Sequence, residues 1–583
     1  MKAMTNKELA KIFYEMADFL EIENEDGFRV SAYRRAATSL ESLEESVEEI
    51  YKRGGVEALQ EISGIGKSIA LKIEEYIERG EIEAYEKLKQ ETPVEMKEMT
   101  KIEGVGPKTV RTLFEKLDVR SMDELEKAAK ENRIAPLFGF DEKTEKNILE
   151  GIEFLKESKG RFRLGEILPR ARKIREELRR LPEVERVDMA GSLRRMKETV
   201  GDVDLLVASE DPEKVMDRFV SLPGVLKIWG KGRTKSSVRV AEGFDVDLRV
   251  IPSESYGAAL QYFTGSKEHN ISLRKVAMEK DFKVNEYGVF KGEEKVAGES
   301  EEEVYRILGM EWTPPELREG KGEIEAALDN SLPELVNSDD IKGDLHCHTN
   351  WSGGEHSIEE MALRARELGY DYLGVADHTK ELRIENGLDE ERLRRQREEI
   401  EEVNSKFKNQ NLKLRVFQGC EANILKNGSI DIDDEVLKEL DFVIAGIHSY
   451  FKMEEEEITE RMIRAMKNPY VDVVSHPCGR LIGMRDAYSI DLERVLKIAR
   501  ETGTVMEVNA SPARFDLNDL NIRRAKEKEV KMIINTDAHH KSQMEFMEQG
   551  VAQARRGWAK KDDILNTKTS KNFLGSLKRN RFK

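Results

Sequence analysis

Two aspartates in an apolar stretch have the type and spacing to do chemistry. Asp202 and Asp204 lie in the sequence DVDLLVA, whose composition is typical of a buried strand. Side chains alternate along a strand, so both carboxylates lie on one face, about 6 to 7 Å apart. Anions this close repel, and their burial is costly unless a cation lies between them. A solvated acidic edge strand is the alternative, and the flanking Val and Leu residues argue against it.

A second acidic pair lies downstream, in the sequence FDVDLRVI. Asp245 and Asp247 again share one strand face. Aspartates on two neighbouring strands form an all-oxygen site, which favours Mg²⁺ or Mn²⁺. Gly191 and Ser192, before the first pair, offer hydrogen-bond donors to a phosphate. The order GS, DxD and then a later Asp resembles the nucleotidyltransferase signature, in which two ions stabilise the attacking oxygen and the leaving pyrophosphate.

The following segment, LQYFTGSKEHNISLRKVAMEKDFKVNEYGVF, resembles the nucleotide-binding region of family X DNA polymerases, those like DNA polymerase beta. The resemblance implies that Asp202, Asp204 and Asp247 are the catalytic carboxylates and bind two ions, Mg²⁺ or Mn²⁺. It selects Asp247 over Asp245, which departs from the polymerase beta pattern and would modulate metal affinity.

The same resemblance implies the contacts to the nucleotide. Ser192 and Arg195 match triphosphate contacts of the family, and Arg170 in ILPRAR is a further candidate. Lys267 and His269 depart from the positions that stack on the incoming base in polymerase beta, which leaves the nucleobase contact open. The implied nucleotide-binding residues are Gly191, Ser192, Arg195, Arg170, Tyr262, Phe263, Gly265, Ser266, Asn270 and Arg274.

An internal repeat occupies the N-terminal region. ISGIGKSIALKI begins at Ile62 and IEGVGPKTVRTL begins at Ile102. In both, glycines permit a tight turn, and the backbone amides of the following helix can hold a phosphate. The duplicated pattern predicts helix-hairpin-helix motifs that bind the DNA backbone. The candidate DNA-binding residues are Gly64, Gly66, Gly104 and Gly106.

The first repeat, together with GFRVSAYRRAATSL, resembles the small lyase domain of the same polymerases. Lys72 falls where that family carries its Schiff-base lysine. Arg35 and Ser68 stand where the family has accessory lysines. The resemblance implies catalysis by Lys72 on an abasic sugar, and an ordinary solvated lysine is the alternative.

Histidines gather in the second half of the chain, where eight of the nine follow residue 340. Six of them, with several carboxylates, come at the ends of apolar strand-like runs, where a parallel barrel or sheet presents its site. Mixed imidazole and carboxylate ligands suit zinc, manganese or iron in a cluster of two or three ions. The candidate ligands are His346, His348, His378, Glu421, His448, His476, Asp537 and His539.

This half resembles the polymerase and histidinol phosphatase (PHP) domain, a distorted barrel found on bacterial and archaeal family X polymerases. The resemblance implies two or three ions, Zn²⁺ or Mn²⁺. Gly353 departs from an Asp that the family often has; the alternatives are that Glu355 or His356 replaces it or that the third site is weak. Cys347 alternates away from the histidine face. The implied ligand sets are His346, His348, Glu421 and Asp537 for one ion, Glu421, His448 and His476 for a second, and His378 and His539 for a third.

The elements that must position these residues change along the chain. Helical spacing runs to about residue 160, mixed α/β patterns follow to about 320, and strands alternate with helices from about 341. The predicted fold class is a multidomain α and α/β protein: a helix-hairpin-helix region, a nucleotidyltransferase palm of the polymerase beta type and a distorted (β/α) barrel. The predicted domains are a lyase-like domain 1–85, a second hairpin subdomain 86–158, the palm 159–254, a nucleotide-selecting subdomain 255–318, a linker 319–340 and the PHP domain 341–583.

Net charge, cysteine content and the length of apolar runs indicate the partners and the cellular compartment of the protein. The net charge of −18 argues mildly against a polyanion partner, but local basic clusters decide binding. Three cysteines do not suggest a disulfide framework, and no apolar run approaches membrane-spanning length. We therefore expect a cytoplasmic monomer away from membranes.

These residues together predict a DNA-directed DNA polymerase that fills short gaps during base excision repair. Its partners are gapped or nicked DNA and deoxynucleoside triphosphates. A metal-dependent 3′-5′ exonuclease, or a related phosphoesterase of DNA ends, is predicted for the C-terminal half. The alternatives are a nucleotidyltransferase that acts on RNA or small acceptors, and a polymerase whose PHP domain is structural and inactive.

Overall fold

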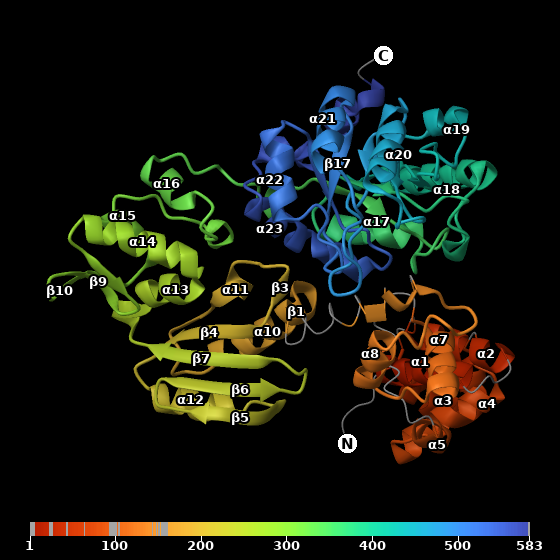
Figure 1. The fold of residues 1–583 in the computed structure, drawn as a ribbon, viewed down its shortest axis with the longest axis horizontal. Coiled ribbons are helices and arrows are strands. Elements are labelled where there is room, and N and C mark those ends of the chain that lie inside the picture. The colour runs from red at the N-terminus through yellow and green to blue at the C-terminus, as the bar shows by residue number, and fades with distance from the viewer. Residues whose placement is uncertain are drawn as a thin grey trace. The chain divides into compact units, whose positions relative to one another are not determined.

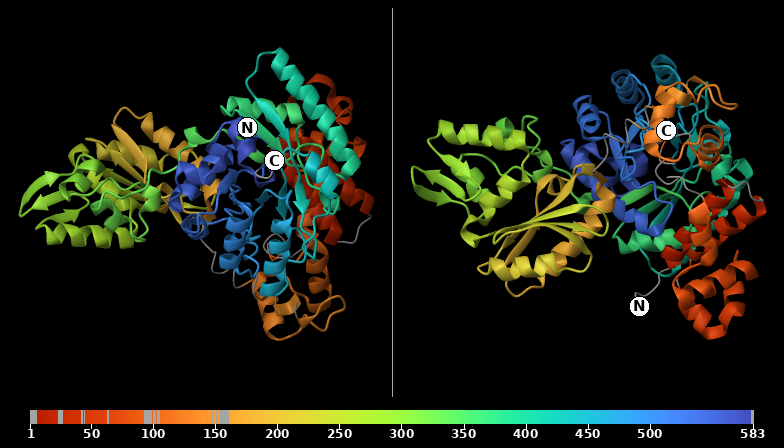
Figure 2. Two further views of the ribbon diagram at one scale, coloured as in Figure 1. Left: turned by 90° about the horizontal axis from the view of Figure 1, so that it is seen from above. Right: turned by 60° about the horizontal axis from the view of Figure 1, so that its bottom comes forward.

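The computed structural model of the protein describes residues 6–580, except for 23–26, 42, 44, 63, 92–98, 100, 101, 103, 104, 143, 147, 150, 151 and 153–160. The chain divides into two compact units, which are described separately. Unit 1 comprises residues 1–159 and 483–485, and unit 2 comprises 160–482 and 486–583. Figures 1 and 2 show the elements of both.

Unit 1 is helical. Two apolar clusters form its core, one around Phe13 and one around Leu113. The second helix of each predicted hairpin begins after a glycine, Gly66 or Gly106, whose extended backbone provides the N-cap without a side-chain cap. Its helices are α1 (Asn6–Ile22), α2 (Gly27–Glu41), α3 (Val47–Gln60), α4 (Lys67–Arg79), α5 (Glu83–Glu91), α7 (Pro107–Leu117) and α8 (Met122–Lys130).

The palm region of unit 2 is built on a five-stranded sheet of order β2-β4-β7-β6-β5, in which β4 and β7 run parallel. Apolar and polar positions alternate along β4 and β7, so one face joins a core with helices α10 (Leu164–Arg179) and α12 (Pro212–Val220). Short strands β1 (Phe162–Arg163) and β3 (Thr199–Val200) pair beside it. The sheet strands are β2 (Arg186–Met189), β4 (Asp202–Ala208), β5 (Val225–Lys231), β6 (Lys235–Val240) and β7 (Asp245–Ile251).

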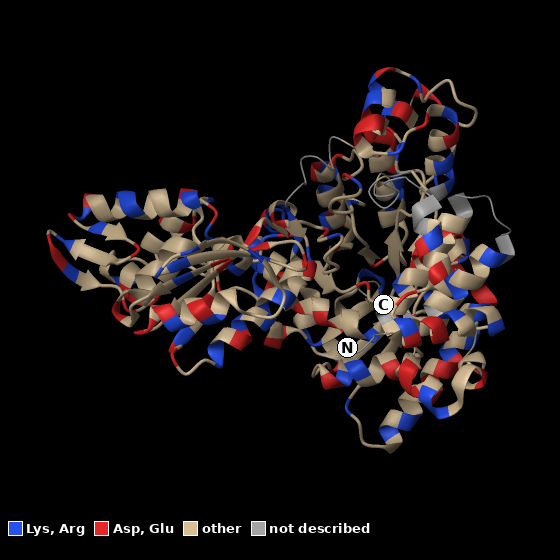
Figure 3. Cartoon of the chain, turned by 90° about the horizontal axis from the view of Figure 1, so that it is seen from below, with Lys and Arg blue, Asp and Glu red and all other residues tan. Residues whose placement is uncertain are grey.

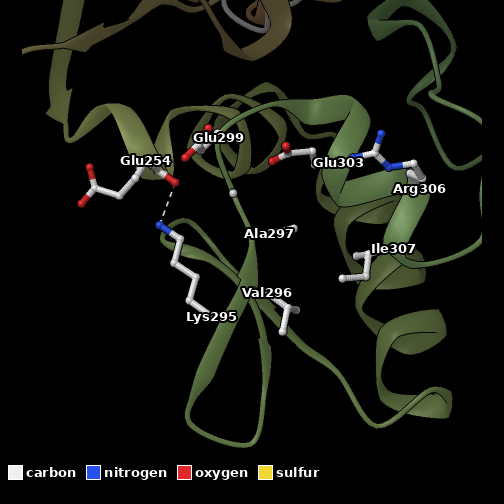
Figure 4. A pocket seen from close by; sticks show the side chains of 9 residues that line it. Glu254, Lys295, Val296, Ala297, Glu299, Glu303, Arg306 and Ile307 are labelled. Carbon is white, nitrogen blue, oxygen red and sulfur yellow. Dashed lines mark hydrogen bonds between the residues drawn. The ribbon is translucent and has the colours of Figure 1, made fainter.

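The nucleotide-selecting region has three helices and a small antiparallel sheet of order β10-β9-β8. A pocket of about 470 Å³ opens on it, and the Lys295 ammonium binds the Glu254 carbonyl there at 2.7 Å (Figure 4). None of the predicted nucleotide-binding residues lines this pocket. The elements are α13 (Tyr256–Thr264), α14 (Lys267–Glu279), β8 (Lys283–Asn285), β9 (Gly288–Lys291), β10 (Glu294–Ala297) and α15 (Glu301–Ile307).

Residues 319–340, predicted as a linker, are folded. They contain α16 (Glu323–Leu328), and the side chains of Glu323, Ile324 and Ala327 are buried. The segment is polar, which is typical of a solvated connection, but its carboxylates find buried partners: Glu323 binds His269 at 2.8 Å. The segment predicted as a linker is therefore partly helical and partly buried.

The C-terminal domain, residues 341–583, holds two parallel sheets of order β11-β12-β13 and β14-β15-β16-β17-β18. Bridges from His378 to Glu421 and from Cys347 to Ala538 link the two sheets at both sides, which gives a distorted barrel. Helices α17 (Ile358–Glu367) to α23 (Met547–Arg556) surround the strands (Figure 1). The strands are β11 (Gly343–Cys347), β12 (Tyr372–Val375), β13 (Arg415–Gln418), β14 (Glu421–Asn423), β15 (Ile444–Gly446), β16 (Val473–Val474), β17 (Val505–Asn509) and β18 (Met532–Asn535).

Charge and cysteine placement add two facts. Lys and Arg are interspersed with Asp and Glu along the ribbon (Figure 3). Cys347, Cys420 and Cys478 are free and buried. In the part of the chain that the structure describes, no helix is long and apolar enough to cross a membrane.

Candidate active sites

The two acidic pairs lie side by side in the palm sheet. In the parallel register of β4 and β7, Asp202 stands opposite Asp245 and Asp204 opposite Asp247. Burial and repulsion from Asp202 and Asp247 raise the pKa of Asp204 to about 7. Partial burial and Asp247 also raise the pKa of Asp202. A cation among these carboxylates would relieve the repulsion, so the donor set fits the predicted Mg²⁺ or Mn²⁺.

Asp245 and Asp247 have different partners. Arg239 holds Asp245 through both carboxylate oxygens, and the Trp229 indole donates to it at 2.8 Å. The Arg239 hydrogen bonds lower the pKa of Asp245, although burial opposes this. Asp247 instead accepts a hydrogen bond from the Ser237 hydroxyl and lies 3.0 Å from the Lys235 ammonium.

The GS motif contacts the acidic pair directly. Gly191 has φ +59°, and a Cβ there would lie 2.1 Å from the Asp204 Oδ2, so only glycine fits. Ala190 also donates its amide to the Asp204 carbonyl at 2.8 Å. The predicted phosphate-binding turn at Ser192 therefore begins beside the predicted metal site.

Arg195 is buried and bound within the protein. Its Nε lies 3.0 Å from Glu319 Oε1, and its NH1 donates to the Thr264 carbonyl. Because Thr264 belongs to the YFTGS motif, this hydrogen bond joins the region of the GS motif to it. Arg195 NH1 also packs closely on Gly265, where a Cβ would lie 3.2 Å away. Arg170, by contrast, is exposed on α10.

The remaining nucleotide-binding candidates line α13 and α14. Asn270 donates to the Tyr262 carbonyl at 2.7 Å, and the Tyr262 and Phe263 rings meet edge to face at 5.1 Å. Ser266 caps α14, and Arg274 is half-buried on that helix. His269 is fully buried between Glu323 and the Tyr305 hydroxyl, both at 2.8 Å, so its ring is unavailable to a base.

Lys72 in unit 1 lies in a pocket of about 590 Å³. Arg35, Ser68, Gly64 and Gly66 line the same pocket. The Lys72 ammonium is 3.4 Å from the Ser68 hydroxyl and 6.0 Å from the centre of the Tyr33 ring. The predicted lyase residues therefore share one cavity with the first hairpin. Gly104, of the second hairpin, lies outside the described residues.

The eight predicted ligands of the C-terminal domain converge at the carboxyl ends of its strands. Glu421 is the centre: its oxygens lie 3.0 Å from His378 Nδ1, 3.2 Å from His448 Nε2 and 3.0 Å from His476 Nε2. In the described residues, three sets have ligand atoms close enough to share an ion. They are His346, His348, Glu421 and Asp537, then His378, Glu421 and His448, and then His348, His378 and His539.

Unpartnered buried atoms point to the same conclusion. Glu421 Oε2, His346 Nε2, His378 Nδ1 and His476 Nδ1 are buried and make no hydrogen bond, although Glu421 Oε2 lies 3.3 Å from His346 Nε2 and 3.0 Å from His378 Nδ1. Native proteins rarely leave buried polar atoms unpaired unless an ion or water pairs with them. Imidazole and carboxylate donors with unused atoms thus fit Zn²⁺ or Mn²⁺.

Electrostatics also favour an added cation. Burial opposes charge on both Glu421 and His346, but each stabilises the other: the pKa of Glu421 lies well below its usual range and that of His346 well above. Burial and the nearby His539 hold the pKa of His348 well below its usual range. Ionised Glu421 and neutral His348 are thus in the form that metals bind, whereas a metal bound by His346 would displace its proton.

Comparison with known proteins settles the family. A helix-hairpin-helix domain model matches residues 4–82, a SAM-like helix-hairpin-helix tandem 96–153, a DNA polymerase beta thumb 259–319 and a PHP domain 344–511. The DNA polymerase/3′-5′ exonuclease PolX of Bacillus subtilis (strain 168) is 38% identical over 584 residues, which cover 99% of this chain and 100% of that protein. The chain belongs to the PolX family.

The C-terminal domain has its own relatives outside PolX. A probable phosphatase of Thermoanaerobacter sp. (strain X514) is 31% identical over 240 residues, which cover 39% of this chain and 91% of that protein. A probable phosphatase of Caldanaerobacter subterraneus is 33% identical over 208 residues, or 34% of this chain and 75% of that protein.

Three residues at the site of this PolX chain were missed by sequence reasoning. Glu507, fully buried on β17, binds His346 Nδ1 at 2.7 Å and accepts the His476 amide at 2.8 Å. Asn423 binds His448 Nδ1 at 2.8 Å. Such partners fix the ring orientation of ligating histidines. A carboxylate inside the apolar run VMEVN was the available signal for Glu507.

The third missed residue is Glu385, which lies beside Gly353. Glu355 is exposed, and the His356 ring lies against the His540 ring, tilted by 49° with the ring centres 4.5 Å apart; neither Glu355 nor His356 belongs to the three ligand sets found in the described residues. A Cβ on Gly353 would lie 2.6 Å from Glu385 Oε2 and 3.4 Å from the His539 ring. The carboxylate of Glu385, distant in sequence, therefore occupies the space beside residue 353.

Proposed function

We propose that this chain is a DNA-directed DNA polymerase that fills short gaps during DNA repair and carries a 3′-5′ exonuclease in its C-terminal domain. One observation carries the polymerase: two acidic pairs in parallel register, with Asp204 against Gly191 of the GS motif. The PolX relative, a DNA polymerase/3′-5′ exonuclease by its name, supports both activities. The substrates would be gapped or nicked DNA and deoxynucleoside triphosphates, and the chain would act as a monomer.

In the palm, Asp202, Asp204 and Asp247 would hold two Mg²⁺ or Mn²⁺ ions. Bound there, such ions supply charge that stabilises the attacking oxygen and the leaving pyrophosphate. Asp247 accepts the proton of the primer 3′-hydroxyl, and Lys235 and Ser237 orient its carboxylate for this step. Beside them, Ser192 and Arg195 bind the triphosphate.

The hairpins would give the preference for gaps. Gly66 and Gly106 are N-cap residues without a side chain that could cap α4 and α7, and backbone amides at a helix N-terminus bind phosphate, although Pro107 at the start of α7 contributes no amide. Two such sites grip the backbone on opposite sides of a short gap. Binding through phosphates also implies a steep loss of affinity with salt.

The C-terminal domain would hydrolyse phosphoesters at 3′ ends with two or three Zn²⁺ or Mn²⁺ ions. Bound ions supply a deprotonated water and stabilise the leaving oxygen. The chain's own part is to hold them with Glu421 and the seven other ligands, to orient the His346 ring through Glu507, and to fix the His476 backbone through the same carboxylate. The alternative, a structural and inactive domain, would account for these buried atoms only if it also bound metal, so 3′ digestion by the metal-loaded protein distinguishes the two.

Lys72 would form a Schiff base with an abasic sugar. Its pocket, shared with Arg35, Ser68 and the hairpin glycines, supports this third activity.

The test uses one gapped, 5′-phosphorylated duplex. Wild type should extend the primer best across a one-nucleotide gap, with activity falling steeply as salt rises, and should digest free 3′ ends with Mn²⁺. Asp204→Asn should lose extension by at least 10³-fold and keep digestion. Equal extension on a one-nucleotide gap and on long single-stranded template would refute gap filling, and absence of 3′ digestion with any divalent ion would refute the nuclease.

A further inference from the structure

The segment between the two catalytic motifs of the palm is held by side chains from the C-terminal domain. Residues 195–198 connect the GS turn to β3 and the acidic strand. Arg556 donates to the Arg195 carbonyl at 2.7 Å, and Gln553 donates to the Met196 carbonyl at 2.8 Å. Both come from α23, which lies beside this part of the palm (Figure 1).

A third contact fixes the end of the segment. Arg480 holds the Glu198 carboxylate through both nitrogens, NH1 at 3.3 Å and NH2 at 2.6 Å. Arg480 also donates to the Phe515 carbonyl. Phe515 is fully buried and belongs to the core of the palm, although it lies in the C-terminal domain.

Arg556, Gln553 and Arg480 are called the clamp below, and Glu319 links Arg195 to it. Its Oε1 lies 3.0 Å from Arg195 Nε and 2.9 Å from Arg556 NH1, and Arg556 NH2 continues to Asp519 at 2.8 Å. The side chains of Arg195, Glu319 and Arg556 are 11%, 12% and 4% exposed. In a buried network of charges, loss of one member leaves its partners uncompensated, so they rearrange.

We propose that Arg556, Gln553 and Arg480 are positioning residues of the polymerase: they set the path of residues 195–198 and thereby aim the Arg195 guanidinium at the triphosphate. The inference rests on the proposed role of Arg195 in triphosphate binding. Without Arg556, the Arg195 carbonyl loses its anchor and Glu319 keeps Arg195 as its main partner. Arg195 then meets the triphosphate less often, which raises KM for the nucleotide.

The experiment measures KM for the incoming nucleotide and kcat on a one-nucleotide gap, together with 3′ digestion by the same full-length protein. Arg556→Ala should raise KM for the nucleotide about tenfold and leave 3′ digestion within twofold. Arg556→Lys, which keeps the charge, should recover part of the loss. The double variant Arg556→Ala, Glu319→Gln should have a KM for the nucleotide no higher than that of the more impaired single variant, because both residues belong to one network.

The matched control is Glu548→Gln. It breaks an exposed ion pair between Arg172 of α10 and Glu548 of α23, which joins the same two domains without touching residues 195–198. Its KM for the nucleotide should stay within twofold of wild type. If Arg556→Ala does not fold, Gln553→Leu, which removes only the Met196 contact at similar volume, carries the same expectation of a raised KM.

Two failures are distinguishable. If Arg195→Ala raises KM for the nucleotide and the clamp variants do not, the clamp is refuted and the role of Arg195 stands. If Arg195→Ala itself leaves that KM unchanged, the proposed triphosphate contact is wrong, and the clamp is overturned with it. A loss of 3′ digestion equal to the loss of extension would also overturn the clamp, since it would mean general damage.

Discussion

Replacement of Glu421 by Gln removes one negative charge at nearly constant volume. Glu421 is 1% exposed and belongs to two of the three ligand sets. Its Oε1 and Oε2 face four imidazoles at 3.0 to 3.3 Å. Glu421→Gln should therefore weaken the binding of two ions at once, whereas loss of an outer ligand such as His539 would weaken the binding of one.

The magnitude follows from what the ions contribute. A catalytic metal site supplies several kcal/mol of transition-state stabilisation. Loss of about 4 kcal/mol corresponds to a roughly 10³-fold lower rate of 3′ digestion. The number of Zn²⁺ or Mn²⁺ ions per chain should fall from two or three to at most one, while extension of a gapped primer stays within twofold.

The assay is metal content by mass spectrometry after dialysis, with 3′ digestion and primer extension measured on the same samples. Glu507→Gln is the matched control, since Glu507 is equally buried but lies outside the three ligand sets: it binds the His346 ring and accepts hydrogen bonds from the His476 backbone amide and from Asn509 and Asn535. It should regain the full ion count when metal is added back to saturation, and it should bind the ion of the His346 set about 10 to 100 times more weakly. Full metal content and unchanged digestion in Glu421→Gln would refute the assignment of Glu421 as the shared ligand.

Three further predictions concern single residues. Asp247→Asn should lower primer extension at least 10³-fold and Asp245→Asn far less, measured as kcat on a gapped duplex; the reverse order would shift the site by one alternation along β7. Borohydride should trap a covalent adduct between wild type and abasic DNA but not with Lys72→Ala, and an equal yield from both would exclude Lys72. Glu385→Gln should lower the metal content by about one ion, and Gly353→Asp added to it should restore that ion; unchanged content in Glu385→Gln would exclude this carboxylate.

Much of both candidate sites follows from local sequence. Strand alternation puts Asp202 and Asp204 on one face, and the run DVDLLVA coincides with β4. The ligands after each apolar run of the C-terminal half meet because the carboxyl ends of parallel strands lie at one edge. The repeated glycine turns likewise predict two helices whose N-cap residue is a glycine, without a capping side chain.

Sequence failed where a side chain depends on partners from distant elements. His269 looks available in the sequence but is buried against Glu323, in a segment whose polarity predicted an open linker. Glu385 reaches Gly353, and Glu507 reaches His346 across 161 positions of the chain. Composition reports whether a residue is polar; it does not report which opposite charge will be buried with it.

The sequence by itself therefore determined the residue types that do chemistry and the strands and helix starts that carry them, because alternation, turn glycines and apolar runs act over a few residues. Only the tertiary structure decided which of those residues are held in place and by what. Arg556 meets the Arg195 carbonyl across 361 positions. Such a contact arises from the docking of two domains, and the free energy of burying a charge then depends on the partner that docking supplies.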